Sequence, residues 1–352
     1  MKKSRNIIIG VLVLSIILTA AAVLAFRQSG EDFRFQYWRE EAGALTALRE
    51  YVRDVTDERS ANYIPKEDRI AVFDMDGTLY GEKAPIYLEW WMFAYRVLKD
   101  PSFAADADLA AVGEKIVKAA ESGVIPEELE REEALAGAKA FAGMSLDEYE
   151  AYVSAFLEKE ADGFSGMTYA EAWYLPMLEV VDYLNRNEFT VYICSGTDRF
   201  LCRTLAEGKV DIPARQIIGM DVLCVADGQG DADGLEYVYS PDDEVVRSDR
   251  LIIKNVKANK VSNIAQEIGA KPVLSFGNSS GDTSMAMYTT SKNPYRSMAF
   301  MVVADDTERE YGDSAKAEKL RNTWDSNGWV SISMKDDWLT VYKEQVSKSQ
   351  YK

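Results

Sequence analysis

Short apolar runs alternate with amphipathic segments along most of the chain. Mostly apolar runs of strand length occupy positions 70–73, 189–194, 272–276 and 297–305. Segments with apolar residues at helical spacing lie around them, as at 41–59 and 258–269. Strands that are buried on both faces carry apolar side chains at every position, so this alternation predicts a parallel sheet covered by helices on both faces.

One long stretch interrupts the alternation. From about residue 82 to 187 the pattern is almost entirely helical, and the segment at 144–161 opens with the capping box of Ser145 and Glu148. The sequence therefore predicts an α/β fold: a three-layer, Rossmann-like core with a parallel sheet and an inserted α-helical cap domain. The core is expected over 27–80 and 188–352, and the cap over 81–187.

Two further strands are expected at 216–225 and 235–240. They flank the segment "ADGQGDADG", residues 226–234, which is rich in turn-forming residues. This segment lacks the glutamate that a calcium-binding loop of the EF-hand type carries farther along the chain. A solvated hairpin turn is therefore the preferred interpretation.

The N-terminus differs from the rest of the chain. Lys2, Lys3 and Arg5 precede an uncharged, apolar stretch at 6–26 that is long enough to cross a bilayer. Positive charge ahead of such a stretch favours a cytoplasmic N-terminus and export of the residues after the stretch. Cleavage after Ala25 is also compatible with the small residues there. The sequence leaves a signal peptide and a membrane anchor at 1–26 both open, and predicts an extracytoplasmic protein, secreted or anchored.

Composition excludes several kinds of chemistry. The 352 residues carry a formal charge of −18 and include no histidine, which removes Ser-His-Asp and Cys-His catalysis and histidine-ligated zinc. The acidic balance argues against nucleic acid as a partner, since phosphate neutralisation needs clustered Lys and Arg. Three cysteines, Cys194, Cys202 and Cys224, are too few for a disulfide framework, although one pair could bridge outside the cell.

Chemically suitable groups come after four of the expected strands. They are Asp74 and Asp76 after the first strand, Ser195 and Gly196 after the second, Lys260 at the start of a helix, and Asn278 and Asp282 in "GNSSGD". Ligands in open parallel sheets gather outside the carboxyl ends of the strands, so these groups are expected to converge.

Such a set suits phosphoryl transfer. Asp74 can attack phosphorus as a nucleophile, and Asp76 can act as the general acid and base. Lys260 and Mg²⁺ can neutralise phosphate charge, with oxygen ligands for the metal among Asp74, Asp76, Asn278 and Asp282. Ser195 and the amides near Gly196 suit the phosphate oxygens.

The same residues carry a family resemblance. "FDMDGTLY", "ICSGT", Lys260 and "GNSSGD" resemble, in order, the four motifs of the haloacid dehalogenase superfamily of phosphohydrolases, over about residues 69–305. The helical insertion resembles the cap of the phosphoserine phosphatase-like branch. The resemblance implies an Mg²⁺-dependent phosphatase with Asp74 as nucleophile, Asp76 as acid/base and metal ligand through its carbonyl, and Ser195 and Lys260 as phosphate contacts. One position departs from the pattern: Asn278 stands where the family usually has Asp.

The expected substrate is a small phosphorylated metabolite. Tyr87, Trp91 and Tyr95 recur at helical spacing with Trp90 beside them, which is typical of a cap core but also of an aromatic wall for a quaternary ammonium group. Glu82 is either a substrate-amine contact or a surface charge. Phosphoserine- and phosphorylcholine-type substrates are both compatible. The alternative to an enzyme is a decayed binding module of the same fold, anchored at the membrane, with Asn278 as the sign of lost metal binding.

Overall fold

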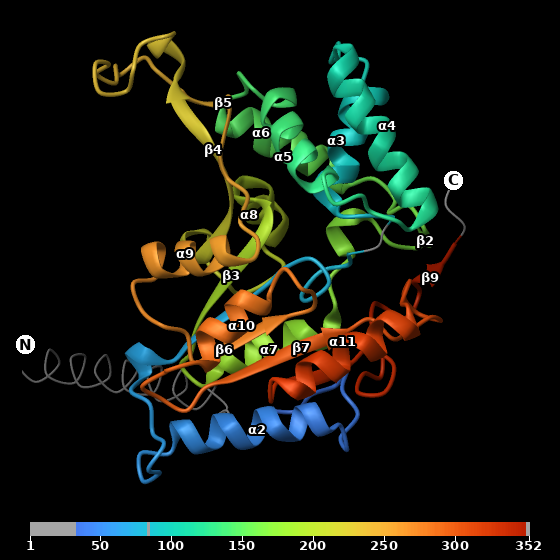
Figure 1. The fold of residues 1–352 in the computed structure, drawn as a ribbon, viewed down its shortest axis with the longest axis vertical. Helices are drawn as coiled ribbons and strands as arrows, with labels where there is room; N and C mark the ends of the chain where they lie inside the picture. The colour runs from blue at the N-terminus through green and yellow to red at the C-terminus, as the bar shows by residue number, and fades with distance from the viewer. Residues whose placement is uncertain (1–32, 83–84, 350–352) are drawn as a thin grey trace, which may run out of the picture.

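The computed structural model describes residues 33–82 and 85–349, and within them a sheet of seven strands forms the centre of the molecule (Figure 1). The strand order is β5-β4-β3-β1-β6-β7-β8. The strands are β1 (Ile70–Phe73), β3 (Thr190–Asp198), β4 (Ile217–Ala226), β5 (Val245–Ile253), β6 (Leu274–Gly277), β7 (Met298–Val303) and β8 (Val330–Ser333). All neighbours are parallel except β4 and β5, which confirms the predicted, mostly parallel sheet.

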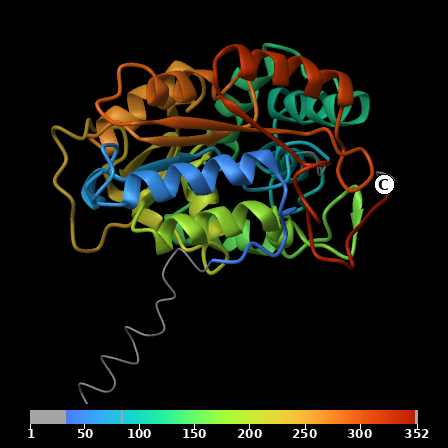
Figure 2. The same ribbon diagram turned by 90° about the horizontal axis from the view of Figure 1, so that it is seen from below.

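The central strands are short and buried throughout. All four residues of β1 and all four of β6 are buried, and the rings of Phe73 and Phe276 stack at 4.1 Å between them. Helices cover both faces of this sheet, as Figure 2 shows. One face carries α2 (Gly43–Thr56) and α7 (Leu175–Arg186), and the other carries α9 (Ala258–Glu267), α10 (Thr283–Thr290) and α11 (Ser314–Ser326). The three-layer core is therefore as predicted.

The helical insertion lies between β1 and β3. It contains α3 (Leu88–Leu98), α4 (Ala107–Ser122), α5 (Leu129–Ala140) and α6 (Leu146–Leu157), which stand above the core in Figure 1. The capping box of Ser145 and Glu148 is present at the start of α6. Helix α7 falls inside the range 81–187 expected for the cap, but it packs against β3 of the core sheet.

The segment after β4 differs from the sequence prediction. Residues 235–240 were expected to form a strand but are irregular, and the partner of β4 is β5, farther along the chain. Leu235 and Val238 are 97% and 86% exposed, so no neighbouring element supports a strand there. Strand β5 instead continues toward the cap, where the amide of Arg247 donates to the carbonyl oxygen of Met144 at 2.9 Å.

Smaller elements complete the fold. The remaining pieces are α8 (Arg199–Ala206), the antiparallel pair β2 (Phe164–Ser165) and β9 (Ser347–Lys348), and four 3₁₀ turns at Lys66–Asp68, Tyr169–Glu171, Ala214–Gln216 and Asp227–Gln229. All three cysteines lie in the described part of the chain and none is in a disulfide. The predicted export segment at 6–26 lies outside the described residues. Within 33–82 and 85–349, every helix is too short or too polar to cross a bilayer.

Candidate active site

The first strand ends in a tight loop that holds both predicted catalytic carboxylates. Asp74 still pairs with the sheet, because its amide donates to the carbonyl oxygen of Phe276 at 2.9 Å. The chain then turns back at Gly77, whose φ of +77° is a left-handed conformation that favours glycine. Asp74 and Asp76 are 6% and 8% exposed. The turn thus fixes two buried carboxylates at the carboxyl end of β1.

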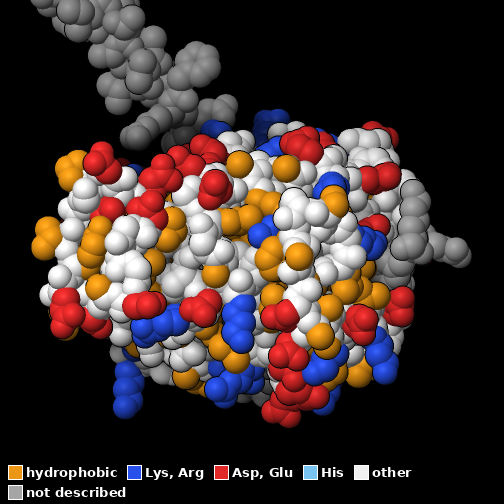
Figure 3. All heavy atoms as spheres, turned by 90° about the horizontal axis from the view of Figure 1, so that it is seen from above, with side chains coloured by type: hydrophobic (Ala, Val, Ile, Leu, Met, Phe, Trp, Pro, Cys, Tyr) orange, Lys and Arg blue, Asp and Glu red, His pale blue; other side chains and the backbone are white. Residues whose placement is uncertain are grey.

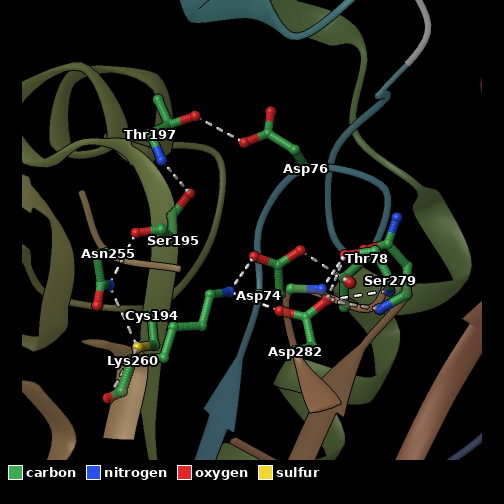
Figure 4. Close-up of polar contacts among 12 residues, drawn as sticks. Asp74, Asp76, Thr78, Cys194, Ser195, Thr197, Asn255, Lys260, Ser279 and Asp282 are labelled. Carbon is green, nitrogen blue, oxygen red and sulfur yellow. Dashed lines mark hydrogen bonds and ion pairs between the residues drawn. The ribbon is translucent and has the colours of Figure 1, made fainter. Parts of the chain in front are cut away.

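Lys260 connects this loop to the one after β6. Its ammonium lies 2.5 Å from Oδ1 of Asp74 and 2.7 Å from Oδ1 of Asp282, and all three side chains are buried (Figure 4). Burial lowers the pKa of Lys260, but Asp282 and Asp74 raise it by more, so it lies above its ordinary value and the ammonium stays charged. Burial and Asp282 raise the pKa of Asp74, against the opposing effect of Lys260.

Asp282 uses its second oxygen to organise its own loop. Oδ2 accepts hydrogen bonds from the amides of Asn278 and Ser279, both at 3.1 Å, and from the Ser279 hydroxyl at 3.2 Å. Both carboxylate oxygens are therefore engaged, one by Lys260 and one by the loop. Asp282 was predicted to be a metal ligand, but both of its side-chain oxygens already bind protein groups. Asn278 uses its side-chain nitrogen in a hydrogen bond, which leaves its side-chain oxygen for a metal ion.

Asp76 faces the loop after β3. Its Oδ2 accepts a hydrogen bond from the hydroxyl of Thr197 at 2.8 Å, whereas its buried Oδ1 accepts none. Burial raises the pKa of Asp76 to about 6, and the Thr197 hydrogen bond opposes that shift. The Ser195 hydroxyl, predicted to contact phosphate, is fully buried and accepts the Thr197 amide at 3.1 Å. Gly196 and Thr197 reach the cavity surface at this point.

A cavity of about 320 Å³ opens over these groups, between core and cap. The core side carries Asp74, Asp76, Gly196, Lys260, Asn278 and Asp282. The cap side carries Tyr87, Trp90, Glu127 and Glu130, with Glu82 at the hinge. The four predicted strand-end segments therefore do line one cavity.

The predicted aromatic wall is divided between two cavities. Tyr87 and Trp90 line the cavity above Asp74, with their rings 5.2 Å apart. Trp91 and Tyr95 line a separate cavity of about 200 Å³ on the cap, where Lys159 lies 4.4 Å from the ring centre of Tyr95. The four aromatic residues therefore do not form a single cage.

A second cluster of buried charges joins the cap to the core, and two of its members, Lys254 and Glu89, also line this cavity. Lys254, directly after β5, lies 3.1 Å from Glu89 of α3 and 3.6 Å from Glu133 of α5. Glu89 also accepts the amide of Asp198 at 2.9 Å, and Asp198 pairs with Arg247 at 2.7 Å. Burial and Glu89 raise the pKa of Glu133 to about 8, although Lys254 opposes this. Neither oxygen of Glu133 accepts a hydrogen bond.

The donor atoms near Asp74 fit a hard cation such as Mg²⁺. The described residues include no group of three or more acidic or cysteine side chains arranged to hold a metal ion. The oxygens at hand are of mixed type: the unpaired Oδ1 of Asp76, the Oδ2 of Asp74, which meets only Thr78 at 3.4 Å, and the amide oxygen of Asn278. Mg²⁺ accepts such sets of one or two carboxylates completed by neutral oxygens and water.

Figure 3 shows the charged side chains on one face of the molecule. There the Lys and Arg side chains are interspersed with Asp and Glu rather than gathered into a continuous basic patch. That distribution agrees with the net charge of −18.

Comparisons with known proteins bear on the fold. No family model matches the sequence, and the curated proteins include no significant match. Among solved structures, a conserved protein of unknown function from Anaerococcus prevotii DSM 20548 is similar over 87% of this chain and 94% of its own, with a TM-score of 0.52 and 12% identity.

Two further solved structures have TM-scores below 0.5. Cytosolic 5′-nucleotidase IIIB bound to cytidine covers 88% of this chain and 92% of its own, with a TM-score of 0.47 and 12% identity. A phosphoserine phosphohydrolase-like protein from Francisella tularensis subsp. tularensis SCHU S4 covers 72% and 92%, with a TM-score of 0.38 and 13% identity. At these identities the likeness extends to the fold alone.

The architecture that the motifs implied, a mostly parallel sheet with a helical insertion after β1, is confirmed. Asp74 comes directly after β1, Gly196 lies at the end of β3 and Asn278 comes directly after β6, whereas Lys260 lies in the first turn of α9. Sequence reasoning assigned no individual role to Thr197, which contacts Asp76, or to Lys254, which pairs with Glu89. The signal for Thr197 was its place directly after Ser195 and Gly196. No local signal marked Lys254, because its partners come from the cap.

Proposed function

We propose that this protein is an Mg²⁺-dependent phosphatase that hydrolyses small phosphomonoesters through an aspartyl-phosphate on Asp74. One observation carries the proposal: the Lys260 ammonium lies within hydrogen-bonding distance of both Asp74 and Asp282, and the three residues come from separate strand-end segments. A buried cation between two carboxylates, at the floor of a cavity, is suited to a substrate that brings further negative charge.

The first step forms a bond from a carboxylate oxygen of Asp74 to phosphorus and breaks the bond from phosphorus to the leaving alcohol. Asp76 donates a proton to that alcohol oxygen. In the second step Asp76 accepts a proton from water, the water oxygen attacks phosphorus, and inorganic phosphate leaves as Asp74 regains its carboxylate. Asp74, Asp76 and Asn278 would hold Mg²⁺, which would neutralise charge on the phosphate when bound.

The cap wall supports a leaving group that carries a cationic amine. Tyr87 and Trp90 present aromatic surface to the cavity, and Glu127 and Glu130 present carboxylates. Aromatic faces and carboxylates both attract ammonium groups. Phosphoserine- and phosphorylcholine-type esters are therefore the proposed substrates.

The test is phosphate release by the full-length chain in mild detergent. The panel contains phosphoserine, phosphocholine, phosphoethanolamine, nucleotides and sugar phosphates, each with Mg²⁺ and with a chelator. We expect metal-dependent release that Asp74→Asn abolishes. Asp182→Asn is the matched control, because Asp182 pairs with Arg186 on the solvent-facing side of α7, and it is expected to retain full activity. Near-normal turnover by Asp74→Asn would contradict the mechanism.

The alternative is a binding module, and Asn278 is the observation that favours it. An amide in place of a carboxylate removes one negative charge from the metal site. Absence of release from every ester, together with retained binding of a phosphorylated ligand by the unmodified chain, would establish this alternative.

Export is a further part of the proposal and rests on the sequence alone. The basic residues before the apolar stretch at 6–26 support an extracytoplasmic domain, secreted or anchored. Protease added to intact spheroplasts that express the full chain should digest the domain, or else the domain should appear in the medium. A domain that stays protected until the spheroplasts are lysed would exclude export, and the mass of the mature chain would show whether cleavage after Ala25 occurs.

A further inference from the structure

Asn278 lies at the position where the metal site has lost a carboxylate, and its side chain contacts a carboxylate from another segment. Its Nδ2 donates a hydrogen bond to Oε2 of Glu82 at 2.8 Å. Glu82 belongs to the hinge between the first strand-end loop and the cap, so it stands outside all four motifs. Both residues line the cavity together with Asp74 and Asp76.

This hydrogen bond fixes the orientation of the amide. An ionised carboxylate only accepts hydrogen bonds, so the end of the Asn278 amide that faces Glu82 must be the NH₂ group. The carbonyl oxygen consequently points away from Glu82. Without Glu82 the amide has no such constraint, and either end can face the metal-binding oxygens.

The backbone around the pair is built for this close approach. A Cβ added to Gly77 would lie 1.9 Å from Nδ2 of Asn278 and 2.6 Å from Oε2 of Glu82. Gly77 is therefore required for the contact by space as well as by its φ of +77°. The segment that carries Glu82 is anchored by the neighbouring amide of Gly81, which donates to the carbonyl oxygen of Ala172 at 2.8 Å.

Charge leads to the same conclusion. Asp282 cannot replace the missing carboxylate, because Lys260 and the loop amides engage both of its oxygens. Glu82 brings one negative charge to within hydrogen-bonding distance of Asn278. An Asp at position 278 would supply a cation with both an oxygen ligand and a negative charge. In this pair Asn278 supplies the oxygen and Glu82 supplies the charge.

We propose that Glu82 is a positioning residue of the metal site: it orients the amide oxygen of Asn278 toward the cation and supplies the charge that Asn278 lacks. This inference rests on the proposed Mg²⁺ dependence. It also assigns Glu82 a role different from that of a substrate-amine contact, which then falls to Glu127 and Glu130.

The test measures binding of Mn²⁺, as a paramagnetic substitute for Mg²⁺, to the full-length chain by electron paramagnetic resonance. Glu82→Gln keeps the shape and removes the charge, and we expect its dissociation constant for Mn²⁺ to rise by about 10- to 100-fold, the usual effect of removing a residue that orients a metal ligand. Adding Asn278→Asp to Glu82→Gln returns the carboxylate to the ligand itself, and should restore affinity to within about threefold of the unmodified chain. Glu132→Gln is the control, since Glu132 pairs with Lys115 on the cap, outside the cavity, and should bind Mn²⁺ unchanged.

The outcomes separate this inference from the proposed function. Unchanged Mn²⁺ affinity in a folded Glu82→Gln would overturn the inference while leaving metal-dependent hydrolysis intact. A rise in KM confined to amine-bearing esters, with Mn²⁺ affinity unchanged, would instead assign Glu82 to the substrate. If the unmodified chain binds no Mn²⁺, the metal dependence itself fails and the inference fails with it. Circular dichroism of each variant, with its thermal midpoint, shows that a loss of affinity is not a loss of fold.

Discussion

Lys260 and Lys254 each meet a pair of carboxylates inside the protein, but the two clusters are built differently. Lys260 lies 2.5 and 2.7 Å from its carboxylate oxygens, and Asp282 has all its remaining hydrogen-bonding capacity used by its own loop. Lys254 lies 3.1 and 3.6 Å from its partners, and Glu133 accepts no hydrogen bond. Each carboxylate oxygen around Lys260 thus has at least one hydrogen-bond partner, whereas neither oxygen of Glu133 has one.

The difference arises from the elements that supply the partners. The groups around Lys260 all belong to the core, at strand ends whose positions the sheet fixes. Glu89 and Glu133 belong to cap helices α3 and α5, whereas Lys254 comes directly after core strand β5. A buried charge without enough hydrogen bonds is costly. The free energy of unfolding should therefore depend on pH through the second cluster, which lies at the junction of cap and core. Three predictions test this contrast.

The largest effect is expected for Lys260→Met. The substitution leaves Asp74 and Asp282 buried without a cation, which should lower the free energy of unfolding by about 3 to 5 kcal/mol. It also removes the phosphate's positive partner, so turnover of the best ester should fall by about a thousandfold or more. Urea unfolding and phosphate release measure the two effects. If turnover by the variant stays within tenfold of normal, Lys260 does not take part in the proposed reaction.

A smaller effect is expected for Lys254→Met. Glu133 can respond to the loss of the cation by keeping a proton, so the free energy of unfolding should fall by only about 2 kcal/mol. Turnover should fall less than in Lys260→Met, because Lys254 touches neither Asp74 nor Asp76. The same two assays compare the variants directly. Equal losses in both would mean that the two clusters do not differ as described.

The smallest effect, and the one with a pH signature, is expected for Glu133→Gln. The folded protein holds a proton on Glu133 up to its pKa of about 8, while an unfolded glutamate releases it near 4.5. The folded state thus binds more protons between these values, and the free energy of unfolding decreases as pH rises through that window. Glutamine cannot ionise, so the variant should be more stable than the unmodified chain at pH 9 and differ little from it in pH dependence below pH 4.5.

Urea unfolding at several pH values checks this gain. Glu89, Lys254 and Asp198 remain in the variant and continue to titrate, so the pH dependence should become shallower without vanishing. A constant difference between the two chains from pH 4 to pH 9 would show that folding does not raise the pKa of Glu133.

The sequence was most informative where function and burial coincide. The apolar run at 70–73, with Asp74 directly after it, predicted both a central strand and the start of the site. All four residues of this strand are buried, so its apolar pattern is unbroken and the first carboxylate marks the strand's end. The strand expected at 235–240 was wrong for the opposite reason. Its apolar residues have no neighbour to pack on, and strand formation depends on a partner that local sequence does not reveal.

The cap was harder to interpret than the core. Helical spacing placed Tyr87, Trp91 and Tyr95 on one stripe, yet Trp91 and Tyr95 line another cavity and Trp90 faces the site. Spacing shows which residues share a face of a helix, but the direction of that face depends on how the helix docks on the rest of the fold. The partners of Lys254 were hidden for the same reason, since Glu89 and Glu133 meet it only after docking.

The contact between Lys260 and Asp74 has a consequence for ligand selection. In the resting protein the nucleophile is paired with the same cation that the proposed substrate needs, so binding of a phosphate is an exchange of anions at one ammonium. A monoester with two negative charges competes well with a single carboxylate, whereas a diester, with one charge, gains far less from the exchange. Inorganic phosphate carries the same charge as the monoester group, and we therefore expect the product to inhibit its own formation.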